Sequence, residues 1–215
     1  MYDFWDKLNF KTDTFWYFEP FAWVEQMKRV FPLEIDLSDP DKWISQFTQP
    51  RPNVACYRTC CLILNNYRVT CGGLGKILEE KYDNGTPKYS NVIQVVIQTS
   101  NEKLENTGNG EEAINYINSE LEKGHPILIG VDRESENKDY NKDLTTEHFI
   151  VITGRKNDDK GIYYHFFEVG TNEKNKELKG VNPNNKLYLQ TDYNLIGNVP
   201  QSTKKYTLTQ VRKNL

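Results

Sequence analysis

The chain has 215 residues, enough for one domain with a substantial hydrophobic core. Hydrophobic residues make up 37% of it and aromatic residues 13%. The formal net charge is -3, so the sequence lacks the excess of positive charge that is typical of nucleic-acid-binding proteins. No apolar run approaches the roughly 20 residues of a membrane span, and the aromatic, acidic N-terminus does not have the pattern of a signal peptide.

The first 45 residues are rich in aromatic side chains. Four of these stand together at positions 15–18, and residues 20–31 predict a short helix with Pro20 in its first turn. The apolar face of this helix would carry Phe21, Val24, Met27 and Phe31. We interpret residues 1–45 as an extension that packs on the main domain, residues 46–215. The alternative is that the aromatic side chains form the wall of a substrate groove or a partner-binding patch.

A polar loop broken by prolines, residues 49–55, leads into a helical pattern that starts at Cys56. Apolar side chains recur at helical spacing as far as residue 67, and the Gly72-Gly73 pair then breaks the chain. Residues 74–82 predict a second helix, and the apolar run at 91–98 predicts a strand.

The second half of the chain begins with its clearest predicted helix, residues 111–123, which Gly124 and Pro126 end. The strands predicted after this helix cover residues 126–131, 148–153, 162–169, 186–190 and 205–212. Residues 133–144 are almost wholly polar, and we expect a mobile loop there. Helices followed by strands that look antiparallel predict an α+β fold.

Four cysteines lie within sixteen positions, and the surroundings of Cys56 favour reactivity. Cys56 follows a polar loop and begins a helix, whose dipole favours the reactive thiolate. Cys60, an alternative nucleophile, and Cys61 take inward positions on this helix, and Cys71 is interpreted as structural. The clustered spacing, without a Cys-x-x-Cys pair, predicts neither a metal site nor a disulfide framework. A single local disulfide, such as one between Cys56 and Cys60, is an alternative that the sequence leaves open.

A histidine at the start of a later strand is the natural base for this thiol. His148 stands where the polar loop meets the apolar run 149–152, and such junctions often present catalytic side chains. His125 in a turn and His165 inside a strand are its rivals, and a structural role for His148 is the alternative. A third group must orient the imidazole through its second ring nitrogen, and Glu168, at the end of the next strand, is our first choice.

Other polar side chains are candidates for the remaining roles. Asn172 and Asn182 are second choices for orienting the imidazole, since a strand-end glutamate is also common at the surface. A developing oxyanion needs hydrogen-bond donors, and the backbone N–H of Cys56 is one. The side-chain amide of Gln49 or Asn53 is the candidate for the other, although Asn53 is also placed to be the N-cap of the helix.

Two segments resemble papain-like bacterial cysteine hydrolases, in particular bacteriocin-leader peptidases and peptidoglycan amidases. The first, Asn53-Val-Ala-Cys56-Tyr-Arg-Thr-Cys60-Cys61, is similar to their nucleophile helix. The second runs from the turn Gly124-His-Pro126 through a strand to Glu147-His148-Phe-Ile-Val-Ile-Thr-Gly154. The resemblance covers about residues 46 to 170. It implies a papain-like fold with N-terminal helices, in which the nucleophile helix packs on an antiparallel β-sheet and residues 46–215 form the catalytic domain.

The resemblance implies a cysteine hydrolase that opens an amide bond in a peptide or a peptidoglycan stem through an acyl-thioester, without a metal or other cofactor. Tyr57 in place of the usual glycine, and Glu168 in place of the more usual Asp or Asn, argue against cleavage of leader peptides. We expect a secreted or delivered bacterial protein with an inhibitory or immunity protein as a candidate partner, and no nucleic-acid or membrane partner. A catalytically silent binding module, and a related transferase or deamidase, are the alternatives.

Overall fold

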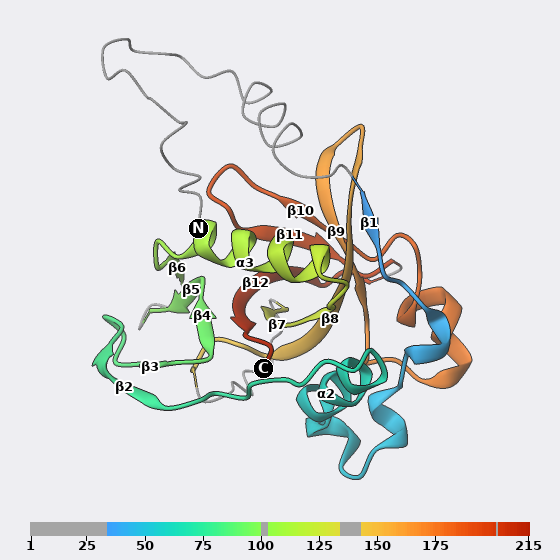
Figure 1. The fold of residues 1–215 in the computed structure, drawn as a ribbon, viewed down its shortest axis with the longest axis horizontal. Coiled ribbons are helices and arrows are strands. Elements are labelled where there is room, and N and C mark those ends of the chain that lie inside the picture. The colour runs from blue at the N-terminus through green and yellow to red at the C-terminus, as the bar shows by residue number, and fades with distance from the viewer. Residues whose placement is uncertain (1–33, 100–102, 134–142, 201) are drawn as a thin grey trace.

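The computed structural model describes residues 34–99, 103–133, 143–200 and 202–215 (Figure 1). The aromatic run and the helix predicted at 20–31 lie outside these residues. The strands are β1 (Ile35–Asp36), β2 (Ile77–Lys81), β3 (Pro87–Tyr89), β4 (Val92–Gln94), β5 (Val96–Gln98), β6 (Leu104–Asn106), β7 (Ile127–Asp132), β8 (His148–Asp158), β9 (Gly161–Phe167), β10 (Lys186–Leu189), β11 (Leu195–Asn198) and β12 (Lys205–Arg212). The helices are η2 (Pro40–Lys42), η3 (Gln46–Thr48), η4 (Pro52–Val54), α2 (Cys56–Asn66), α3 (Gly110–Glu122), η5 (Glu173–Asn175) and η6 (Lys176–Gly180).

Six antiparallel strands close into a barrel. Their order is β8, β7, β12, β11, β10 and β9, and β9 pairs with β8 again to complete the ring. β1 adds to the ring beside β8, and β4 beside β12. The register shifts between Ile152 and Gly154 and between Leu208 and Gln210, and such irregularities bend strands so that a sheet can curl.

The predicted papain-like α+β fold is therefore wrong: the structure is mostly β, a closed barrel with added strands and few short helices. Residues 74–82, predicted as a helix, contain β2, which pairs with β3 and is exposed along its length. Ile77 and Leu78 produced the helical spacing there, but both are exposed, so the pattern does not mark a buried helix face. The sequence analysis also missed β11, without which the ring does not close.

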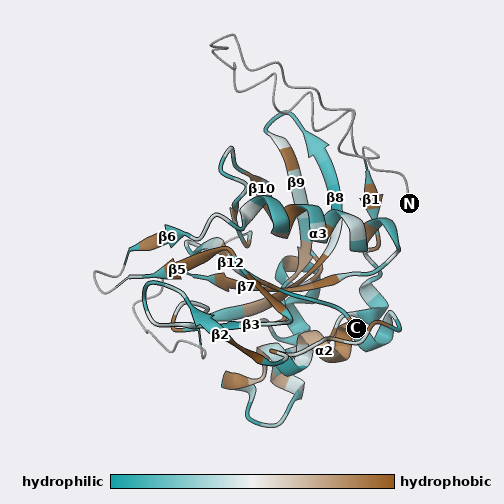
Figure 2. Ribbon diagram, turned by 60° about the vertical axis from the view of Figure 1, so that its left-hand side comes forward, coloured by the Kyte–Doolittle hydropathy of each residue, from teal (hydrophilic) through white to brown (hydrophobic). Residues whose placement is uncertain are grey.

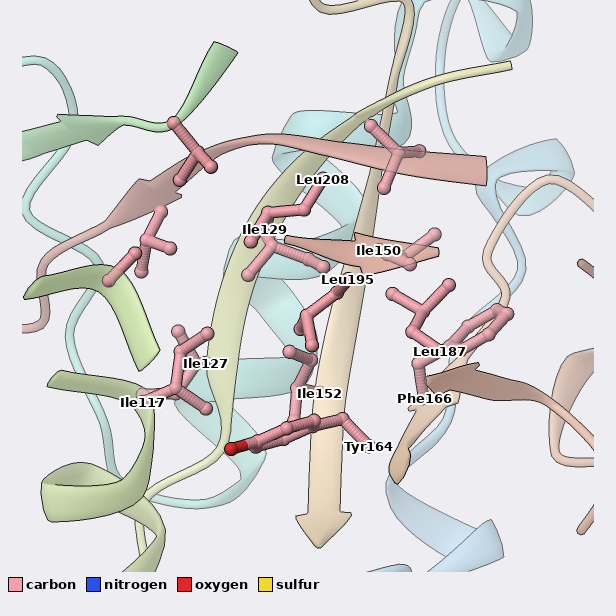
Figure 3. Close-up of a cluster of buried hydrophobic side chains, with 14 of the residues drawn as sticks. Ile117, Ile127, Ile129, Ile150, Ile152, Tyr164, Phe166, Leu187, Leu195 and Leu208 are labelled. Atoms are coloured by element: carbon pink, nitrogen blue, oxygen red, sulfur yellow. The ribbon is translucent and has the colours of Figure 1, made fainter. Parts of the chain in front are cut away.

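Alternate residues of the barrel strands face two different cores. Those that point into the barrel pack with the apolar face of α3, which carries Ile117. Figure 3 shows this residue with the strand residues Ile127, Ile129, Ile150, Ile152, Tyr164, Phe166, Leu187, Leu195 and Leu208. The residues between them point outward and pack with α2, among them Leu128, Phe149, Val151 and Phe167. Because both faces of β7 and the first part of β8 are covered, these strands are continuous apolar runs.

Helix α2 lies on the outer face of β7 and β8, away from α3 (Figure 1). Its side chains Cys60, Ile63 and Leu64 are fully buried against these strands. Cys56, the first residue of the helix, lies beside the start of β8, where the backbone N–H of Phe149 donates to its sulfur. The packing of one apolar helix face thus determines where Cys56 lies.

The far end of β8, residues 156–158, is hydrophilic and partly exposed (Figure 2). β2 pairs with β3, and β5 with β6, in small two-stranded sheets. Among the described residues, no helix combines the length and the apolar character needed to cross a membrane.

Candidate active site

The structure brings Cys56, His148 and Glu168 together from three elements. Cys56 is the first residue of α2, His148 the first residue of β8, and Glu168 directly follows β9. Nε2 of His148 lies 2.7 Å from Oε1 of Glu168. The imidazole also shares a hydrogen bond with the Cys56 thiol. Since Nε2 is engaged by the carboxylate, Nδ1 is the ring nitrogen left for the sulfur.

Glu168 is buried, and its oxygens are satisfied by hydrogen bonds. Oε1 faces His148 and also accepts from the backbone N–H of Gly170, and Oε2 accepts from the Tyr206 hydroxyl at 2.7 Å. The indole N–H of Trp43 donates to the backbone carbonyl of Glu168 at 2.8 Å. A buried carboxylate is costly unless it is paired and hydrogen-bonded, and here both conditions hold.

Position 170 requires a residue without a side chain. A Cβ there would lie 2.7 Å from Oε1 of Glu168 and 3.2 Å from Cε1 of His148. Glycine therefore lets the backbone approach the carboxylate closely and donate to it. The close approach of the His148 ring, which lies on β8, was not predictable from the residues around position 170.

The charges at the site favour a thiolate–imidazolium pair. Burial raises the pKa of Cys56, but the hydrogen bond and positive charge of His148, with the N–H groups of Phe149 and Tyr57, outweigh it and lower this pKa. Burial lowers the pKa of His148, but the negative charge of Glu168 and the contact with Cys56 outweigh it and raise this pKa to about 9. The two groups titrate as a coupled pair, in which each stabilises the charged form of the other.

The carboxylate holds its charge despite burial. Burial raises the pKa of Glu168, but the positive charge of His148 and hydrogen bonds from His148, Tyr206 and Gly170 outweigh it, so the pKa is lowered. Burial and the adjacent carboxylate raise the pKa of Tyr206 well above its ordinary value. The tyrosine hydroxyl therefore stays protonated and donates a hydrogen bond to Glu168.

The start of α2 presents backbone donors beside the thiol. Ala55 is the N-cap and makes no side-chain cap, so the prediction that Asn53 caps the helix is wrong. Asn53 lies exposed in η4. Within the described residues, the N–H of Cys56 has no backbone acceptor, as is usual in a first helical turn. The side-chain amide of Gln49 donates to Thr48 at 3.1 Å, a contact outside the triad.

The rival residues have other partners. Cys60 is fully buried, and burial raises its pKa well above the ordinary value, so it is a core residue. His165 contacts Ser38 and Thr153 through Nδ1 and the carbonyl of Asn182 through Nε2. His125 lies 3.0 Å from Glu120. Asn172 accepts at the start of η5, and Asn182 donates to two nearby carbonyls.

A buried polar network anchors the segment that leads to His148. Oδ2 of Asp143 accepts hydrogen bonds from Gln94 at 3.0 Å, Thr146 at 2.6 Å and Gln210 at 2.7 Å. Gly130 gives room for this segment, since a Cβ there would lie 2.7 Å from the Thr146 side chain. Most of the polar loop predicted at 133–144 lies outside the described residues, but the network fixes its C-terminal end.

Replacing Tyr206 with phenylalanine is expected to lower the stability of the fold while leaving Cys56, His148 and Glu168 in place. The change leaves Oε2 of the buried Glu168 without its donor, which costs about 1–3 kcal/mol of unfolding free energy. Denaturant unfolding measures this cost. Tyr188→Phe, which removes a hydroxyl that donates to Asp158 at 3.0 Å near the surface, is the matched control and should cost less. Equal losses in the two variants would contradict a special role for the buried hydroxyl.

Comparison with protein-family models, curated proteins and solved structures found no match to this chain. In the part of the chain that the structure describes, no group of three or more His, Cys, Asp or Glu side chains could hold a metal ion.

Proposed function

We propose that this protein is a cysteine hydrolase that opens an amide bond through an acyl-thioester. The observation that carries the proposal is the hydrogen-bonded series Cys56, His148 and Glu168, in which a half-buried thiol at a helix start is followed by two buried groups. A thiol with a lowered pKa, next to a base that a third group orients, is the recurring arrangement of nucleophilic catalysis.

The residues have the following roles. The Cys56 thiolate attacks the amide carbonyl carbon, and the backbone N–H groups at the start of α2 stabilise the oxyanion. The His148 imidazolium gives its proton to the leaving amine, and the neutral ring then takes a proton from the water that opens the thioester. Glu168 holds the ring in the orientation and tautomer that both steps require.

The substrate we propose is a peptide or the peptide stem of peptidoglycan. A silent binding module is the second candidate, but it gives no reason for a thiol and an imidazole in hydrogen-bond contact beside a buried carboxylate. A transferase would use the same three residues but pass the acyl group to an amine instead of water. A deamidase would use them with water as the acceptor and release ammonia from a side-chain amide. The products distinguish these reactions.

The experiment is a mass-spectrometric product assay on purified peptidoglycan and on a mixed peptide library. The wild-type chain is compared with Cys56→Ala, and His125→Ala is the control for a histidine outside the site. New free carboxyl and amine ends that require Cys56 would support hydrolysis. Products in which another amine replaces the leaving amine would indicate transfer. The proposal fails if neither substrate changes, or if Cys56→Ala gives the wild-type products.

The pH dependence of stability follows from the shifted pKa values. The pKa of Glu168 is lowered in the folded state, so its contribution is present above its unfolded value of about 4.3 and lost as pH falls through the folded value. The pKa of His148 is raised to about 9, so its contribution is present below about 6.5 and lost as pH rises through about 9. The pKa of Cys56 is lowered, so its contribution grows as pH rises toward the unfolded thiol value of about 8.5 and opposes the loss from His148. We expect the free energy of unfolding to decline on the acid side of this window and, on the alkaline side, to decline above about pH 8.5.

Denaturant unfolding at a series of pH values measures this profile, and His148→Ala is the informative variant. Without the imidazolium, the decline above about pH 8.5 should become shallower than in the wild-type chain. An unchanged alkaline decline in His148→Ala would show that other groups cause it and would contradict the charged state assigned to His148.

A further inference from the structure

Two further cysteines form a contact on the face of α2 that carries Tyr57. Cys61 lies one helical turn after Tyr57 on α2, and its thiol interacts with that of Cys71, in the loop after α2. The Tyr57 hydroxyl lies 3.4 Å from Sγ of Cys71. Both cysteines are free thiols that are only partly buried. The backbone at Cys71 is held by a bridge to Asn214.

A buried cation faces this pair. Arg212, in β12, is only 6% exposed, and its positive charge acts on both Cys61 and Cys71. One N–H of its guanidinium donates to the carbonyl of Gly73 at 3.1 Å, while its Nε has no hydrogen-bond partner within the described residues. The rings of Tyr57 and Phe149 lie 5.5 Å from the guanidinium carbon and help to shield it from water. The carboxylate of Asp143 also acts on this cation, and the unpaired Nε leaves a donor that favours a further anion nearby.

We propose that Cys71 is a second reactive thiolate, which takes up a low-molecular-weight disulfide such as oxidised glutathione, and that Cys61 then resolves the adduct to a Cys61–Cys71 disulfide. This inference does not depend on the proposed hydrolase activity.

The anion is assigned to Cys71 because the donors converge there. Cys61 and Tyr57 share hydrogen bonds with its sulfur, the N–H of Gly73 donates to it, and Arg212 adds a positive charge; together they outweigh burial and lower its pKa to about 6. The pKa of Cys61 rises, chiefly through its contact with Cys71. The other titratable groups that act on Cys71 are Cys60 on α2 and Tyr116 on α3.

The chemistry balances in two exchange steps. The Cys71 thiolate attacks one sulfur of the small disulfide, forms a mixed disulfide and releases one small thiolate. Cys61 loses its proton to solvent and attacks the Cys71 sulfur, which releases the second small thiolate. The two protein thiols are oxidised by two electrons, and the small disulfide is reduced. The two protein sulfurs, one on α2 and one in the loop after it, must approach to about 2.05 Å.

The test uses the full chain carrying Cys56→Ala, so that the proposed nucleophile does not contribute. The protein is incubated with oxidised glutathione near pH 7, and every cysteine is mapped by mass spectrometry. We expect a Cys61–Cys71 disulfide, a stable glutathione adduct on Cys71 when Cys61→Ser is added, and no reaction at Cys61 when Cys71→Ser is added. An adduct that forms first on Cys61, or equally fast on the fully buried Cys60, would overturn the proposal.

A second variant tests the donor that lies beside Cys71. Tyr57→Phe keeps the ring that packs edge-on against Phe149 at 5.2 Å and removes only the hydroxyl. Glutathione uptake by Cys71 at pH 6 should become about tenfold slower, because a hydrogen bond to a charged group is lost. Tyr67→Phe, whose hydroxyl donates to the carbonyl of Leu37, is the matched control and should leave the rate unchanged. Equal rates in the two variants would contradict the thiolate assignment.

Discussion

Cys56→Ala is expected to abolish turnover while leaving the fold nearly as stable as before. The sulfur is the atom that attacks the substrate, and removing the nucleophile from a hydrogen-bonded triad lowers kcat by at least about 10⁴-fold. The stability change should be within about 1 kcal/mol, because Cys56 is half-buried at a helix start and alanine is a good helix former.

The matched control for Cys56→Ala is Cys60→Ala, one helical turn further along. Cys60 is fully buried, so this variant should lose about 1–2 kcal/mol of stability and retain the nucleophile. The two variants are compared by product formation and by denaturant unfolding. If Cys56→Ala were the less stable of the two, or if it kept its turnover, Cys56 would be a core residue and not the nucleophile.

Glu168→Ala is expected to have the largest effect on stability. It leaves the buried His148 without its counter-charge and the Tyr206 hydroxyl without its acceptor. Breaking a buried pair in this way costs about 3–5 kcal/mol. Turnover should also fall by about 10²–10⁴-fold, because the imidazole loses both its orientation and the group that stabilises its charge.

Glu168→Gln separates orientation from charge. The amide oxygen can still accept the hydrogen bond from the His148 ring, so turnover should fall less than in Glu168→Ala or His148→Ala. The amide carries no negative charge, so the pKa of His148 should fall from its raised value. The ring titration, followed by nuclear magnetic resonance, measures this shift. An unshifted His148 pKa in Glu168→Gln would contradict the role given to the Glu168 charge.

The local features of the site were predictable because each has a short-range cause. The helix that begins at Cys56 follows a proline-broken polar loop and an apolar run, and the structure confirms it as α2. The strand predicted from His148 is confirmed as β8, and the helix predicted at 111–123 as α3. Glu168 was placed at a strand end by the same reasoning, and it directly follows β9.

The fold was not predictable, because closing a barrel depends on pairings between distant residues. The contact of β8 with β9 and the path through β10, β11 and β12 leave no periodic signal that separates a closed ring from an open sheet. Tyr206 illustrates the same limit within the site. Its position in a predicted strand was correct, but its hydrogen bond to Glu168 spans 38 positions of the chain. The need for glycine at position 170 arises partly in the same way, because the His148 ring, from β8, lies beside it.

The coupling between Cys56 and His148 is tested most directly by the rate at which iodoacetamide alkylates Cys56 as a function of pH. Adducts must be assigned by mass spectrometry, since Cys71 also has a lowered pKa. In the wild-type chain and in His125→Ala, alkylation of Cys56 should be rapid well below pH 8.5, the approximate pKa of an ordinary thiol. In His148→Ala it should become slow and follow the alkaline profile of an ordinary thiol. An identical profile in the wild-type chain and His148→Ala would contradict the thiolate–imidazolium pair.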